Sequence, residues 1–229
     1  MHATFFVLPN AVAESVTGWR DAVARGHEIG NHTQTHPCSR AFEWSRANPV
    51  ERLTIADYRV EVQEANRSLR ELLGVEPTVF AYPCGHTSVG EGPSTQSVIP
   101  LIAEMFEVGR TFNNIGANSP ADLDPAQIAC VNSDEQSFSD LLPILEATLA
   151  DGAWLVLGGH EIGSPGEGDG DATWVEAIEA VVTWCERSGV WVDTIGNVAQ
   201  SLPTGGSGAT GSLSRLAKVS RALRRTWGG

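Results

Sequence analysis

The stretch His27-Glu-Ile-Gly-Asn-His-Thr-Gln-Thr-His-Pro37 joins a short strand pattern to two histidines that are four residues apart. We expect the strand at His27 to Asn31, leading directly into the histidine-rich run. An apolar run from Ala3 to Leu8 predicts an earlier strand. Between them, the helical spacing of apolar residues from Ala11 to Arg25 predicts one helix, which ends at Gly26. The chain therefore opens as strand, helix, strand.

The same alternation continues along the chain. Strands and helices that alternate at this length are typical of an α/β domain with parallel strands, and a barrel-like closure fits their number. In such barrels the chemistry lies at the C-terminal ends of the strands. The further strands are expected at Thr78 to Tyr82, Val108 to Phe112, Trp154 to Leu157 and Val190 to Val192, and the helices at Ile55 to Leu73, Ser97 to Phe106, Phe138 to Ala150 and Trp174 to Arg187.

Length and composition indicate one ordinary globular domain. The chain has 229 residues, of which 41% are hydrophobic and 19% charged, enough for one sizeable core. We expect this domain over residues 1–202, followed over 203–229 by a Gly/Ser-rich linker and a basic tail that is either an amphipathic helix or a disordered terminus. The net charge of −13 disfavours a nucleic-acid partner.

The compartment stays open. The lack of an apolar run of about 18 residues predicts no transmembrane segment, and the first residues are too few for a signal peptide. Four cysteines lie far apart without a Cys-x-x-Cys pair, which argues against a zinc knuckle or a thioredoxin-like site.

His32 and His36 are the strongest candidates for metal ligands. Two imidazoles at this spacing converge on one cation if the turn between them is tight, each placing a ring nitrogen about 2.0 to 2.1 Å from Zn²⁺. The structural alternative is a pair of surface or core histidines near a turn. The position after a strand favours the metal hypothesis, with a divalent ion, Zn²⁺ first, as the cofactor.

Two further segments end strands in the same way. Tyr82-Pro83-Cys84-Gly85 sets a turn whose backbone either borders a substrate groove or is only a strand-end turn. His160 follows an apolar strand through two glycines, so it is either a general acid at the rim of a barrel or an exposed loop histidine.

Together these segments resemble the polysaccharide deacetylase family, which shares its domain with nodulation protein B and forms carbohydrate esterase family four. The run from His27 to Pro37 resembles the metal-binding motif of that family. Phe80 to Gly85 is similar to its third motif, Leu155 to His160 to its last, and Trp191 to Ile195 to its closing strand. The resemblance covers the chain from residue 3 to about residue 202.

The resemblance implies a distorted (β/α) barrel in which one Asp and two His hold Zn²⁺ or a similar ion. It implies that His32 and His36 are metal ligands and that His160 is the general acid, with Asp134 supporting it. It also implies that a groove formed by Tyr82, Pro83, Cys84 and Gly85 receives an acetylated oligo- or polysaccharide.

Three departures qualify this resemblance. The family's first motif, Thr-Phe-Asp-Asp, supplies both the base and the carboxylate ligand. It precedes the strand that Ala3 to Val7 resembles, and only Met1 and His2 stand before that strand here. On this resemblance the barrel lacks its first strand. The chain is then either a fragment or a relative that has lost hydrolysis. Many members have an Arg where Ala81 stands, a role that is vacant here or filled by another residue such as Arg110.

The third departure is Cys84, where a Tyr is common. Cys38 and Cys84 flank the same expected site, so they either form a disulfide or simply pack together.

Two hypotheses for the function remain. The first is a metal-dependent hydrolase that removes N-linked or O-linked acetyl groups from a carbohydrate. The second is a catalytically impaired, carbohydrate-binding or structural relative. The sequence does not distinguish among acetylated substrates, and it leaves the metal and the oligomeric state open.

Overall fold

A parallel four-stranded sheet organises the computed structural model, which describes residues 1–166 and 171–202. Its strand order is β1-β2-β3-β6, and Ala81 on β3 lies opposite Arg110 on β6. All three residues of β3 are buried, as expected where helices cover a parallel sheet. The strands are β1 (Thr4–Val7), β2 (Glu28–Asn31), β3 (Val79–Ala81) and β6 (Val108–Arg110).

Short strand pairs continue the structure beyond β6. A parallel bridge joins Arg110 to Ile128, just before β7. Two further pairs are parallel, β7 with β8 and β9 with β10, and β4 with β5 is antiparallel. Their bounds are β4 (Ser88–Val89), β5 (Gln96–Ser97), β7 (Val131–Asn132), β8 (Leu157–Gly158), β9 (Glu161–Gly163) and β10 (Ala172–Trp174).

The predicted α/β class with parallel strands is confirmed. Within the described part of the chain, the ladders form separate sheets, and β1 pairs with β2 alone.

The long helix α3 (Ile55–Leu73) has the predicted bounds. Its N-terminus is a capping box, because Thr54 Oγ1 accepts a hydrogen bond from the Asp57 N–H while the Asp57 carboxylate accepts one from the Thr54 N–H. Gly74 ends the helix in the left-handed conformation, with φ 72°. Local signals therefore mark both ends of this helix, whose apolar face is buried in the core.

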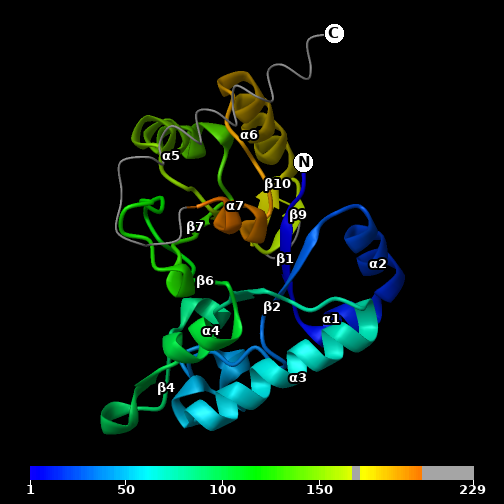
Figure 1. Ribbon diagram of the computed structural model, residues 1–229, viewed down its shortest axis with the longest axis vertical. Helices are drawn as coiled ribbons and strands as arrows, with labels where there is room; N and C mark the ends of the chain where they lie inside the picture. Colours follow the sequence, from blue (N-terminus) through cyan, green and yellow to red (C-terminus); the bar gives the residue numbers. More distant parts are fainter. Residues whose placement is uncertain (167–170, 203–229) are drawn as a thin grey trace.

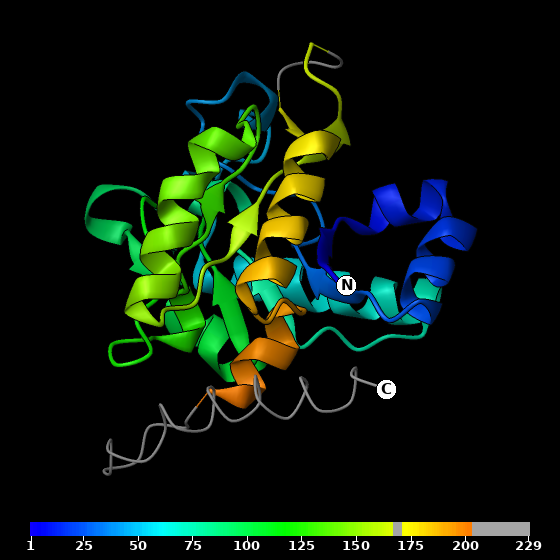
Figure 2. The same cartoon turned by 90° about the horizontal axis from the view of Figure 1, so that it is seen from above.

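Four of the remaining helices lie in two groups at opposite ends of the molecule (Figure 1). Helices α1 and α2 pack near α3, whereas α5 and α6 pack together at the opposite end of the molecule. The view from above shows α1 and α2 on the far side of α6 from α5 (Figure 2). The bounds are α1 (Pro9–Glu14), α2 (Val16–Ala24), α4 (Ile99–Met105), α5 (Phe138–Asp151), α6 (Val175–Ser188) and α7 (Ile195–Ser201).

Within residues 1–166 and 171–202, five short 3-10 helices complete the connections. They are η1 (Glu43–Ser45), η2 (Val50–Arg52), η3 (Pro83–Gly85), η4 (Gly92–Ser94) and η5 (Pro125–Gln127).

Helix α7 is attached to the first two strands by hydrogen bonds. The backbone N–H of Ile195 donates to Thr4 Oγ1 over 2.8 Å, and the Thr4 hydroxyl donates to Glu28 Oε2 over 2.6 Å. The Gly196 N–H also donates to the same carboxylate oxygen. The start of α7, far along the sequence, is therefore held against β1 and β2.

Two sequence predictions are wrong in detail. The single helix expected from Ala11 to Arg25 is two helices, because the backbone of Ser15, with φ −146° and ψ 54°, leaves the helical region between α1 and α2. The strand expected from Val190 to Val192 is irregular backbone. Among the described residues no strand pairs with this segment, and a strand needs a partner for its backbone groups.

The strand expected from Trp154 to Leu157 is found only at its end, as β8. The linker and basic tail expected at 203–229 lie outside the described residues. No described helix has the length and apolar character needed to cross a membrane.

Candidate functional site

A large cavity opens where the parallel strands end. Its volume is about 2440 Å³, and its walls include His32, His36, Arg110, Phe112 and His160. These residues follow or end β2, β6 and β8, which is where parallel α/β folds place their chemistry. The three histidines singled out from the sequence therefore lie in one cavity.

His32 is held by a hydrogen bond from one ring nitrogen, and no described residue hydrogen-bonds to the other. Its Nδ1 lies 2.8 Å from the Ala81 carbonyl oxygen, so Nδ1 carries the proton and donates it there. This tautomer leaves Nε2 with a lone pair, and a backbone acceptor of this kind typically orients metal-binding histidines. Burial, reinforced by the positive charge of Arg110, holds the pKa of His32 well below 6.5, so the ring is neutral.

His36 reaches the same place through a tight turn. Thr33 and His36 both adopt left-handed backbone conformations, with φ 65° and 57°, which non-glycine residues rarely adopt. The Asn31 side chain accepts from the Thr33 N–H over 2.7 Å, and Thr33 Oγ1 accepts from the His36 N–H over 3.0 Å. These bonds stabilise a turn that sets the His32 and His36 ring centroids 4.6 Å apart.

The donor set around these rings is short of carboxylates. Burial, then the nearby His160, lowers the pKa of His36 below 6.5, so this ring also favours its neutral, metal-binding form. Among the described residues, the one group of three potential donors is His36 with Cys38 and Cys84, and those two cysteines are joined in a disulfide. The residues present therefore fit a divalent ion through two imidazoles, without an acidic third ligand.

His160 forms a dyad with Asp134. Its Nδ1 lies 2.7 Å from Asp134 Oδ2, and its backbone N–H donates to Oδ1 over 3.1 Å. The Thr173 hydroxyl also donates to Oδ1, over 2.7 Å. The His160 side chain is 58% exposed and that of Asp134 is 3% exposed. A buried carboxylate therefore orients a histidine whose other nitrogen remains available to a ligand in the cavity.

Arg110 lies between two aromatic rings. Its guanidinium carbon is 4.8 Å from the Phe6 ring centroid and 5.3 Å from that of Phe112, within the range of cation–π contacts. None of the ion pairs found among the described residues involves it. A positive charge without a carboxylate partner therefore lies beside His32 and His36.

The turn from Tyr82 to Gly85 has residues that are buried in the core and residues that line the cavity. Tyr82 is fully buried, burial raises its pKa, and its hydroxyl donates to the Ala126 carbonyl over 2.6 Å. Tyr82 and Cys84 contribute to the cavity wall. Pro83 is buried in the same turn, and Gly85 lies against the backbone of Phe112. The phenol hydroxyl is therefore already committed within the protein.

Sequence reasoning missed Thr173 and Phe6. Thr173 supports Asp134, yet it has no distinctive local pattern. Phe6 lies in the first strand, and its contact with Arg110 exists only in the folded protein. Arg110, which the sequence suggests for the role vacant at Ala81, pairs with Ala81 across neighbouring strands.

The comparisons with known proteins agree with the resemblance read from the sequence. Residues 1–90 match the polysaccharide deacetylase family. The chain is 41% identical over 68 residues to a chitooligosaccharide deacetylase of Bradyrhizobium sp. (strain ANU 289), covering 30% of this chain and 26% of that protein. It is 31% identical over 121 residues to the uncharacterized protein YlxY of Bacillus subtilis (strain 168), covering 52% of this chain and 32% of the relative. The matched segments thus span about a third or less of these relatives.

Solved structures show the same fold. Peptidoglycan deacetylase PdaC from Bacillus subtilis has 18% sequence identity and a TM-score of 0.52, over 99% of this chain and 83% of that one. BA3943, a CE4 family pseudoenzyme from Bacillus anthracis, has 16% identity and a TM-score of 0.52, over 87% of this chain and 56% of that one.

Proposed function

We propose that this chain, whose residues 1–90 match the polysaccharide deacetylase family, is a metal-dependent hydrolase that removes acetyl groups from a carbohydrate. One observation carries the proposal: the neutral pair His32 and His36 and the Asp134-held His160 line the same cavity. We place this chemistry in a distorted (β/α) barrel.

The metal would be held by the two imidazoles. His32 offers Nε2, because its Nδ1 donates to Ala81, and His36 is set beside it by the Thr33 turn. The chemistry that a divalent ion such as Zn²⁺ supplies there is Lewis-acid polarisation of an acetyl carbonyl. Since both rings are neutral, neither has to lose a proton before it binds the ion.

His160 would handle the leaving group. The Asp134 carboxylate accepts from Nδ1, which fixes the ring orientation and stabilises the protonated imidazolium. The imidazolium then donates its Nε2 proton to the departing amine of an N-acetyl sugar or to the alkoxide of an O-acetyl sugar. Asp134 is a positioning residue in this scheme, because it acts through His160.

The substrate would enter along the wall that contains Cys84 and Tyr82. Both residues line the same cavity as His36. Acetylated oligo- or polysaccharide is the substrate class that the family match favours. Both N-linked and O-linked acetyl groups fit the proton donor described above, since either leaving group needs one proton.

A catalytically impaired carbohydrate-binding or structural domain is the alternative. One observation supports it: within the described residues no carboxylate joins His32 and His36 in a three-donor group. Two neutral ligands beside Arg110 leave an ion with little compensating charge. We therefore expect weak metal binding and slow hydrolysis by this chain.

The test measures metal content and acetate release together. The full chain is dialysed, assayed for bound metal, and incubated with N-acetylated chitin oligosaccharides at increasing Zn²⁺ concentrations. We expect little metal after dialysis and acetate release that depends on added Zn²⁺. Oligosaccharide binding without acetate release at saturating Zn²⁺ would instead support the impaired domain.

A further inference from the structure

The disulfide between Cys38 and Cys84 lies against the proposed metal site. The Sγ atoms of both cysteines and a ring nitrogen of His36 all lie within 4.8 Å of one another. The cysteines come from two separate loops, one after the histidine run and one after β3, with Cα atoms 6.0 Å apart. Two sulfur atoms are thus held beside an imidazole that is itself a proposed ligand.

We propose that reduction of this disulfide creates a thiolate site for Zn²⁺, with Cys38, Cys84 and His36 as ligands. The inference rests on the proposed function, because it takes His36 as a metal ligand. It adds a second state of the same site, in which the ion is held mainly by sulfur. His32, whose ring centroid is 4.6 Å from that of His36, is placed to supply the fourth donor.

The spacing suits zinc. A tetrahedral zinc ion holds sulfur ligands at about 2.3 Å and nitrogen ligands at about 2.0 to 2.1 Å, which sets its donor atoms roughly 3.5 Å from one another. In the disulfide the two sulfurs are closer than that, so they have to separate, whereas the imidazole is already within reach. Small side-chain rotations after the bond opens would therefore complete the geometry.

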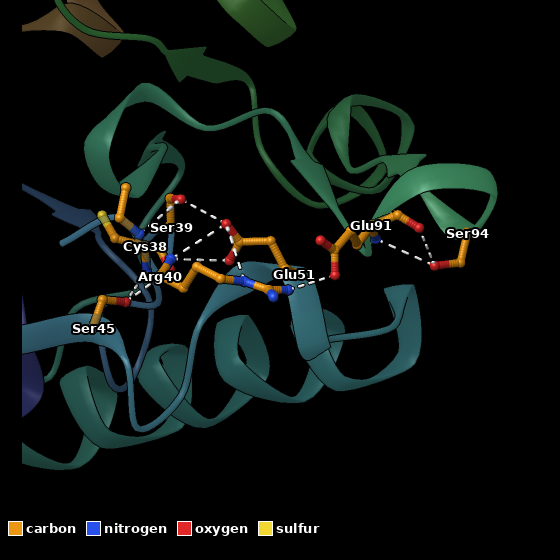
Figure 3. A network of polar contacts seen from close by, with 8 residues as sticks. Cys38, Ser39, Arg40, Ser45, Glu51, Glu91 and Ser94 are labelled. Carbon is orange, nitrogen blue, oxygen red and sulfur yellow. Dashed lines mark hydrogen bonds and ion pairs between the residues drawn. The ribbon is translucent and has the colours of Figure 1, made fainter. Parts of the chain in front are cut away.

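The loop that contains Cys38 is fixed by bonds that do not involve the disulfide (Figure 3). The Cys38 N–H donates to Ser45 Oγ over 2.9 Å, and Ser45 Oγ donates back to the Cys38 carbonyl over 2.7 Å. The ion pair between Arg40 and Glu91 spans 2.6 Å and ties the Cys38 loop to the chain after β4. Cys38 therefore stays near His36 when its bond to Cys84 is broken.

The other loop is also held by its own backbone. Gly85 donates from its N–H to the Tyr82 carbonyl over 2.9 Å, which closes the turn around Cys84. Tyr82 is anchored in turn through its hydroxyl to Ala126. Cys84 thus has a fixed backbone position that does not depend on its partner.

Charge favours the reduced state as the metal-binding one. Arg110 lies close enough to His32 and His36 to lower the pKa of both, and it has no carboxylate partner in the described part of the chain. A divalent ion bound by two neutral imidazoles adds two positive charges next to this guanidinium. Two thiolates cancel that charge, and thiolate is a ligand that zinc prefers.

The redox step balances with a phosphine as the reductant. The phosphine attacks the sulfur of Cys84, which lines the cavity and is less buried than Cys38, and the S–S bond breaks to release the Cys38 thiolate. Water then hydrolyses the phosphorus–sulfur bond at Cys84, which gives the phosphine oxide and leaves both cysteines as thiols. Binding of Zn²⁺ by both sulfurs releases two protons. With His32 as the fourth ligand, no coordination position is left for a substrate carbonyl.

The experiment compares the full chain in its oxidised state and after phosphine reduction, with the number of free thiols measured in each. Co²⁺ serves as the spectroscopic probe and Zn²⁺ as the competitor. We expect a sulfur-to-cobalt charge-transfer band only after reduction. We also expect the reduced protein to bind Zn²⁺ at least about 100-fold more tightly, which corresponds to about 2.8 kcal/mol at 1.4 kcal/mol for each factor of ten. No band in a fully reduced protein would overturn the proposal.

Two variants separate thiolate binding from simple loosening of the loops. The Cys38→Ser/Cys84→Ser variant lacks the disulfide but offers no thiolate, so it should show no band and no gain in affinity. A gain equal to that of the reduced wild type would contradict the proposal. Cys185→Ser removes a buried free thiol elsewhere and should behave as the wild type. Alkylating the reduced wild-type protein gives the same test if the double variant does not fold.

The outcome is separable from that of the proposed function. Acetate release by the oxidised protein tests the hydrolase, whereas the cobalt band of the reduced protein tests the thiolate site. If the protein is inactive but shows the band, the thiolate site is supported and the proposed hydrolase activity is contradicted. An active protein without the band would do the reverse.

Discussion

The ring Nδ1 of His160 and the Oδ2 of Asp134 lie 2.7 Å apart, joining an exposed imidazole to a buried carboxylate. This pairing predicts that Asp134→Asn lowers acetate release by about 100-fold, because the amide no longer stabilises the imidazolium. Bound Zn²⁺ should not change. Kinetics and metal analysis of the same preparation check both.

His160→Ala is the companion variant. It should reduce turnover at least as much and likewise leave metal content intact. If His160→Ala loses metal in proportion to activity, the residue is a ligand and its role as an acid is wrong.

Gly159 is predicted to be intolerant of a side chain. A Cβ at this position would clash with Thr173 Oγ1 and Asp134 Oδ1, the two atoms that support the dyad. Gly159→Ala should therefore displace the Asp134 carboxylate and lower turnover about as much as Asp134→Asn. Gly163→Ala is the matched control, since its Cβ would meet Ala172 Cβ at an ordinary 3.5 Å. Equal effects of the two changes would mean that the dyad is not the cause.

The buried histidines predict a stability that falls on acidification. Burial lowers the folded-state pKa of His32 and His36 below 6.5. Below that value the unfolded chain binds more protons than the folded one, so the free energy of unfolding decreases as the pH falls from about 6.5 toward the folded-state pKa values. Urea unfolding of chelator-treated protein at several pH values measures this slope. His32→Gln should flatten it, and an unchanged slope would argue against a buried neutral His32.

Arg110 is predicted to weaken the metal site of the oxidised protein. Its charge lies beside both imidazoles without a carboxylate partner in the described residues. Repulsion between this charge and a bound cation at a partly buried site would weaken binding by on the order of 1 kcal/mol or more. Arg110→Met should keep the contacts with Phe6 and Phe112 and bind Zn²⁺ about fivefold tighter, measured by competition with a chromophoric chelator. Arg110→Lys retains the charge and should bind as the wild type. Weaker binding by the Met variant would show that Arg110 supports the ion.

Much of this architecture is encoded locally. Helix α3 has the bounds predicted from the spacing of its apolar residues and from the stop at Gly74. His32, His36 and His160 share one cavity because each follows a strand of a parallel fold, and the C-terminal ends of such strands lie together.

Other features depend on contacts that a linear pattern does not contain. The residues Val190 to Val192 have a strand-like pattern, but a strand needs a pairing partner, and none of the described strands pairs with this segment. Similarly, Cys38 and Cys84 are 46 residues apart, and only the fold decides that they bond. Arg110 pairs with Ala81 by register, which the sequence could suggest but not establish.

The most direct test of the central claim is acetate release from N-acetylated chitin oligosaccharide by the oxidised full chain, titrated with Zn²⁺. Wild type is compared with His32→Gln/His36→Gln, and each sample is repeated after chelation. We predict that wild type releases acetate only when Zn²⁺ is added and that the double variant releases none at any concentration. Release that survives chelation, or that is equal in the double variant, would contradict a metal-dependent site at His32 and His36.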